Sequence, residues 1–115
     1  MEWSTGGKLI AAFLIGGTAV SCIGRDPPSI TSCDPDRLVP AIKEGVQRND
    51  RTIIPYLVAD LESDDSAVRF YAIDGLQRMT GQDFGYVFYA DPDTRKPAVE
   101  RWKQWLKEQN VASGQ

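Results

Sequence analysis

The chain has 115 residues, of which 42% are hydrophobic and 25% charged, and a formal net charge of −3. This length allows one small domain once a leader is removed, and the interspersed charges form no basic stripe, which argues against a nucleic-acid partner. Histidine does not occur, so the commonest general base and the commonest metal ligand are both missing.

The first 21 residues have the pattern of an export signal. Residues 9–24, between Lys8 and Arg25, carry no formal charge. As a helix they would span roughly 24 Å, which is less than the roughly 30 Å hydrocarbon core of a bilayer. The apolar run that starts at Leu9 ends in small residues before Cys22, as a signal peptide does at its cleavage site. We therefore predict a signal peptide over residues 1–21.

The boundary Ala19-Val20-Ser21-Cys22 resembles the lipobox of bacterial lipoproteins, in which small residues precede a cysteine that is acylated after cleavage. It departs from that pattern at Ala19, where the family prefers leucine. The resemblance implies a covalent lipid on Cys22, no other cofactor, and stable anchoring through two or more acyl chains. Ile23, in place of an acidic residue, favours the outer membrane. A soluble secreted protein that begins at Cys22 and a retained signal anchor are the alternatives.

Residues 22–36 contain three prolines among polar residues, and we predict a lipid-attached, flexible tether there. Cys33 lies within it and can pair with Cys22 only if Cys22 is unmodified. Otherwise Cys33 is a free thiol or forms an intermolecular bridge. No CxxC motif is present, so neither a zinc site nor a covalent haem is indicated.

From residue 37 onward the apolar residues recur with the period of an α-helix. Four helices are predicted: from Arg37 to about Arg48, from Ile53 to Leu61, from Ser66 to Met79, and from Pro97 to Lys107. Pro40 should lie in the first turn of its helix, where its missing N–H is not needed. Gly81 should end the third helix in a left-handed conformation. Residues 82–96 should form an aromatic-rich loop, and residues 111–115 a disordered tail.

The third helix carries Val68-Arg69, Ala72 and Leu76 behind Asp64-Asp65, a pattern that resembles the first helix of a HEAT repeat. The segment 54–61 is similar to the second helix of the preceding repeat. Residues 80–86 and 98–106 resemble the closing segment of small bacterial HEAT-repeat proteins.

The resemblance to HEAT repeats covers residues 37–108. It implies an all-α domain over residues 37–110, built from about two HEAT-like repeats as two antiparallel helical hairpins. Since about three repeats are normally needed for stability, Phe84 and Trp102 should cap the core. Arg69 should tie the turn between the repeats.

No residue set forms a predicted catalytic or metal site. Two helical hairpins offer little concavity for a pair of catalytic carboxylates, so capping and solvated roles are favoured for the acidic residues, which are Asp60, Glu62, Asp64, Asp65, Asp74, Asp83, Asp91 and Asp93. The segment from Asp91 to Thr94 reads as a turn rather than a calcium loop.

Several aromatic side chains are candidates for contact with a partner. Tyr86, Phe88 and Tyr89 form either a recognition patch or packing between the last helices. Trp105 lies at the margin of its apolar stripe and is a candidate for an exposed contact.

These features predict a non-enzymatic, HEAT-like binding or scaffold domain. It would be tethered through Cys22 to a membrane of the bacterial cell envelope, facing the periplasm, and would present a helical surface to an unidentified envelope protein. Two alternatives stay open: a periplasmic enzyme accessory or hydrolase-like domain that uses a carboxylate cluster, and a plain structural spacer.

Overall fold

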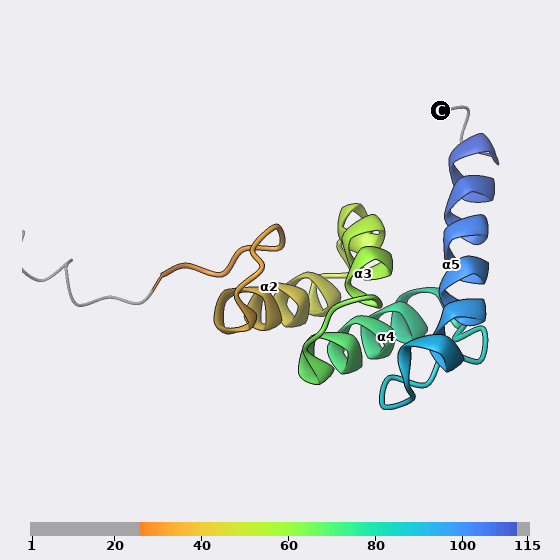
Figure 1. Ribbon diagram of the computed structural model, residues 1–115. Coiled ribbons are helices and arrows are strands. Elements are labelled where there is room, and N and C mark those ends of the chain that lie inside the picture. Colours follow the sequence, from red (N-terminus) through yellow and green to blue (C-terminus); the bar gives the residue numbers. More distant parts are fainter. Residues whose placement is uncertain (1–25, 113–115) are drawn as a thin grey trace, which may run out of the picture.

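The computed structural model describes residues 26–112, and the regular structure in that part of the chain is entirely helical (Figure 1). The elements in chain order are α2 (Pro35–Gln47), the short 3-10 helix η2 (Arg51–Ile53), α3 (Ile54–Asp60), α4 (Ser66–Thr80) and α5 (Pro92–Ala112). The predicted all-α class is therefore confirmed. The predicted signal peptide, Cys22 and residues 113–115 lie outside the described residues. None of the helices within residues 26–112 has the length and apolarity needed to cross a bilayer.

The third predicted helix, α4, begins and ends as its cap residues indicate. The Asp65 carboxylate accepts hydrogen bonds from the backbone N–H groups of Ala67 and Val68, at 2.8 and 3.0 Å. Gly81 follows the helix with φ of 79°, the left-handed conformation that a residue without a Cβ adopts at little cost. Both termini are thus fixed by local side-chain and backbone chemistry.

Two helices begin earlier than predicted, α2 by two residues and α5 by five, for the same reason. Each is preceded by an aspartate that caps it, Asp34 for α2 and Asp91 for α5, and each has a proline as its first residue. Pro40 and Pro97 therefore occupy the sixth helical position, so the prediction that each lies in a first turn is wrong. Each proline lacks the N–H that would donate to the carbonyl four residues earlier in the helix. That carbonyl belongs to an exposed aspartate, Asp36 or Asp93, where water can reach it.

The chain that precedes α2 folds back onto that helix. The backbone N–H of Ser29 donates to the carbonyl of Arg37, and the Arg37 Nε donates to the carbonyl of Pro27, both at 3.0 Å. Ile30 packs against the core. The described part of the predicted tether is thus held against the domain from Pro27 onward. At the other end, α5 continues through Ala112, two residues into the predicted tail.

Helix α4 is at the centre of the packing, against α2 and α3, while α3 also contacts α5. The two predicted hairpins are therefore not the main packing units. The core that results is made of buried apolar side chains, of which Trp102 is the largest. Gly75 lets α2 and α4 approach, because a Cβ there would lie 2.7 Å from Cγ2 of Val46.

Candidate binding surface

The loop of residues 81–91, between α4 and α5, is fixed by side chains that reach it from both helices. Arg69 on α4 donates from Nε to the carbonyl of Phe88 at 2.9 Å and from Nη1 to the carbonyl of Ser63 at 2.8 Å. One guanidinium therefore joins the loop to the turn between α3 and α4. The prediction that Arg69 ties this turn is confirmed, although its acceptors are carbonyl oxygens rather than the neighbouring aspartates.

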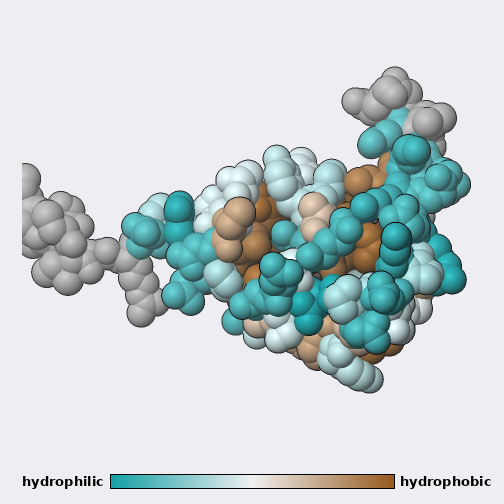
Figure 2. Space-filling view, in the orientation of Figure 1, coloured by the Kyte–Doolittle hydropathy of each residue, from teal (hydrophilic) through white to brown (hydrophobic). Residues whose placement is uncertain are grey.

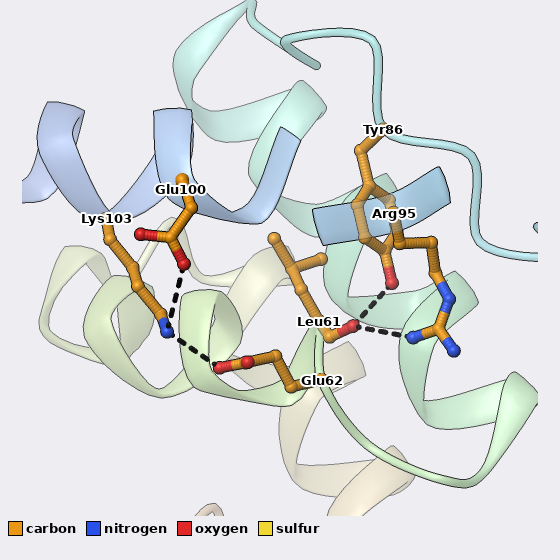
Figure 3. A network of polar contacts seen from close by, with 6 residues as sticks. All are labelled: Leu61, Glu62, Tyr86, Arg95, Glu100 and Lys103. Atoms are coloured by element: carbon orange, nitrogen blue, oxygen red, sulfur yellow. Dashed lines mark hydrogen bonds and ion pairs between the residues drawn. The ribbon is translucent and has the colours of Figure 1, made fainter. Parts of the chain in front are cut away.

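Arg95 on α5 makes a second connection between the same segments (Figure 3). Its Nε donates to the carbonyl of Ala90 at 2.9 Å, and its Nη1 to the carbonyl of Leu61 at 3.4 Å. The Tyr86 hydroxyl donates to the same Leu61 oxygen at 2.6 Å. Burial raises the pKa of the Tyr86 phenol, and the positive charge of Arg95 opposes that rise.

The start of the loop is held by α5 and by ring packing. Arg101 Nη1 donates to the carbonyl of Phe84 at 2.9 Å, and Trp102 Nε1 donates to the carbonyl of Asp83 at 3.2 Å. Phe84 has φ of 54°, which a non-glycine residue adopts only when its surroundings impose it. Its ring meets that of Trp102 edge to face, with centroids 4.8 Å apart. The predicted capping of the core by these two rings is confirmed.

With its backbone fixed, the loop exposes apolar side chains beside α4. We call Phe70, Val87, Phe88 and Tyr89 the aromatic surface. Phe70, Val87 and Tyr89 are 40%, 38% and 78% exposed. The Phe88 ring contacts Phe70 and Tyr89 edge to face, at centroid distances of 5.1 and 5.2 Å. Figure 2 shows hydrophobic residues along the lower edge of the molecule, where Figure 1 has α4 and this loop.

The three residues predicted as partner contacts are placed differently from one another. Tyr89 belongs to the aromatic surface, whereas Tyr86 is 6% exposed and packs in the core, so its ring is not available to a partner. Trp105 is half-buried, stacks edge to face on Trp102 at 5.4 Å, and lines a separate hollow of about 670 Å³ beside α5.

Most of the acidic residues considered in the sequence have structural roles. Asp65 and Asp91 cap helices, and the Asp83 carboxylate accepts a bond from the backbone N–H of Gly85 at 2.8 Å. Two others form ion pairs, Asp74 with Arg78 and Glu62 with Lys103. Among the described residues, no group of three or more Cys, Asp or Glu side chains is arranged to hold a metal ion.

Asp60, at the end of α3, differs from the other carboxylates in being partly buried without a partner. Its Oδ2 is the one buried side-chain nitrogen or oxygen in the described part of the chain that has no hydrogen-bond partner. Burial raises the pKa of this carboxyl from its ordinary value of 3.8 to about 6. The ionised form is thus disfavoured, since neither a cation nor a donor compensates its loss of water.

The chain matches no protein-family model, no curated protein and no solved structure. The resemblance to HEAT repeats therefore stays a prediction.

Two members of the aromatic surface were not recognised as such in the sequence. By their spacing Phe70 and Ile73 should both widen the apolar face of α4, but only Ile73 is buried, whereas Phe70 is 40% exposed. Val87 is a single valine in a loop and carries no sequence pattern. The signal visible in the sequence is the cluster of four aromatic residues within residues 84–89.

Proposed function

We propose that this domain is a non-catalytic protein-binding module whose aromatic surface contacts an apolar protein segment. The observation that carries the proposal is Tyr89, which is 78% exposed on a loop whose backbone carbonyls are bound by three arginines. Tyrosine and other aromatic residues supply much of the binding energy at protein interfaces. A loop that is already ordered loses little conformational entropy when it binds.

Exposure of these rings does not serve the stability of the isolated domain. Burying an aromatic side chain removes roughly 150–250 Å² from water, and Phe70 and Tyr89 forgo much of that gain. By contrast, Tyr86 of the same loop is buried in the core. The same loop thus supplies core packing on one side and an uncovered aromatic surface on the other, as expected if a partner covers the latter.

We also propose a HEAT-like arrangement for the domain. Helix α2 packs against α4, and α3 contacts α5, so each helix meets its counterpart in the next hairpin, as in repeat solenoids. With only about two repeats, the 81–91 loop and α5 would supply the closing cap. Partner binding by a helical repeat surface is the function that this resemblance favours.

The proposed location is a membrane of the bacterial envelope, with a lipid on Cys22 and the domain in the periplasm. Cys22 precedes Pro27, the first residue held against α2, by five positions, so roughly 18 Å of chain separates them at most. The start of α2 would then lie close to the bilayer. In Figure 1 the 81–91 loop lies at the other end of the domain from that start, where a partner can reach it.

Site-specific photo-crosslinking tests the proposed function in cells that make the protein. The substitution Tyr89→p-benzoylphenylalanine should yield a covalent adduct with one distinct envelope protein. The matched control places the same photoreactive residue at Gln47, which is exposed on α2, and should yield none. Adducts of equal intensity at both positions, or none at Tyr89, would contradict the proposal, as would adducts made only with lipid or with a second copy of the chain.

A further inference from the structure

Resting on the proposed function, we infer that the partner segment is basic and carries lysine or arginine side chains beside its apolar anchors. The carboxylates that flank the aromatic surface are not neutralised within the domain. They come from the turn before α4, the end of the 81–91 loop and the first turn of α5, and they are Asp64, Asp65, Asp91 and Asp93. None of them forms an ion pair with another side chain of the described residues.

The three arginines of this region are bound to the backbone. Arg69, Arg95 and Arg101 each donate to a loop carbonyl, and Arg95 is only 9% exposed. Two carboxylates elsewhere are paired within their own helices, Glu44 with Arg48 and Asp74 with Arg78. The region around the loop therefore presents carboxylates without an ion pair, while its three arginines donate to backbone carbonyls.

Two of these carboxylates lie together beside the aromatic surface. Asp64 and Asp93 line one hollow of about 330 Å³, and Lys96 is the one exposed cation in its lining. Arg69 binds the carbonyls of both Ser63 and Phe88. Asp64 follows Ser63, and Tyr89 follows Phe88. Arg69 therefore holds the acidic hollow and the exposed tyrosine at the same edge of the domain.

Charge decides between the possible occupants of this surface. A second copy related by symmetry would bring the same carboxylates face to face, and like charges in contact disfavour association. A membrane surface that contains anionic lipids would be repelled in the same way. A basic segment with apolar side chains complements both the aromatic surface and the unpaired carboxylates. Its apolar groups would cover the rings, and its cations would approach the carboxylates.

The test uses the full-length protein in its native envelope with the photoreactive residue at position 89. Charge reversal of the hollow by Asp64→Lys with Asp93→Lys should lower the adduct yield about tenfold or more. The matched control, Asp36→Lys with Glu44→Lys, makes the same change in net charge on exposed positions of α2 and should leave the yield within about twofold. The crosslinked peptide, identified by mass spectrometry, should have a positive net charge.

The neutral pair Asp64→Asn with Asp93→Asn guards against a folding defect, and it should give an intermediate yield with an unchanged melting temperature. Raising the salt concentration in isolated envelopes from about 50 mM to about 500 mM should also lower the yield. An adduct that survives charge reversal, or a crosslinked peptide that is neutral or acidic, would overturn the inference while leaving the proposed function intact. Absence of any adduct in the otherwise unaltered chain would instead overturn the proposed function.

Discussion

Arg69 and Arg95 bind the same two segments of the chain, residues 61–63 and 88–90, at positions two residues apart. Neither guanidinium forms an ion pair with a carboxylate of the described residues, and each donates to one carbonyl in each segment. The two segments run in opposite directions, like neighbouring strands, but side chains rather than backbone amides form the connections. The position of the aromatic surface therefore depends on this pair of arginines.

Loss of either arginine should destabilise the domain. Arg69→Ala leaves two carbonyls without their donor, and we expect the free energy of unfolding to fall by about 2 kcal/mol. The double variant Arg69→Ala with Arg95→Ala should lose less than the sum of the single effects by about 1 kcal/mol, since both arginines hold the same segments. Urea titration of all four proteins measures this coupling. Strict additivity would mean that the two connections act independently.

Burial of Asp60 predicts a stability that falls as pH rises. The pKa of this carboxyl is about 6 in the folded domain against an ordinary 3.8, so its contribution is fully present below about pH 4 and is lost as pH rises through 6. The side chain is only half-buried, and we expect the loss to be about 1 kcal/mol. Asp60→Asn should remove this component of the pH dependence and should be more stable than the original chain at pH 7. Parallel pH profiles of the two proteins would contradict this.

Trp102 should be the most sensitive position of α5. Its side chain is fully buried, packs on Phe84 and donates to a loop carbonyl, so Trp102→Ala should lower the free energy of unfolding by about 3–5 kcal/mol. Trp105→Ala is the matched control on the same helix, and its half-buried ring should cost less than about 2 kcal/mol. A loss below about 1 kcal/mol for Trp102→Ala would show that this ring does not hold the cap in place.

The close approach of α2 and α4 predicts a specific coupling at Gly75. Alanine is normally better than glycine inside a helix by about 0.5–1 kcal/mol. Gly75→Ala should nevertheless destabilise the domain by about 1–2 kcal/mol, because the new Cβ would lie 2.7 Å from Cγ2 of Val46. With Val46→Ala already in place, the same change should become close to neutral or favourable. Equal effects in both backgrounds would contradict the packing described.

Local signals predicted α4 well but misplaced the starts of α2 and α5. The aspartate cap and the left-handed glycine of α4 each depend only on residues next to the helix ends in the sequence. The sequence alone is therefore sufficient to predict where α4 begins and ends. Helices α2 and α5 begin within the same seven-residue pattern, Asp-Pro-Asp-x-x-x-Pro, at residues 34–40 and 91–97. The predicted helices place the second proline of each pattern in the first turn, with Pro97 as the first residue of the last helix. The first proline, behind its capping aspartate, is the actual first residue of each helix.

The candidate surface was predictable only in part, for a tertiary reason. The aromatic richness of the 81–91 loop is visible in the sequence, but which rings point inward is decided by contacts between distant residues. Tyr86 is drawn into the core by a bond to Leu61, 25 positions away. Phe88 is fixed by Arg69, 19 positions away. Tyr89, one residue further on, has no such bond and stays exposed.

We propose that the aromatic surface serves a partner rather than the fold, and Tyr89→Ala tests this proposal most directly. The measurement is the amount of the partner identified at position 89 that copurifies with the full-length chain from solubilised envelopes. We predict that Tyr89→Ala lowers this amount about tenfold, while the free energy of unfolding changes by less than about 0.5 kcal/mol. Undiminished recovery of the partner by a Tyr89→Ala protein that is equally stable would contradict the claim.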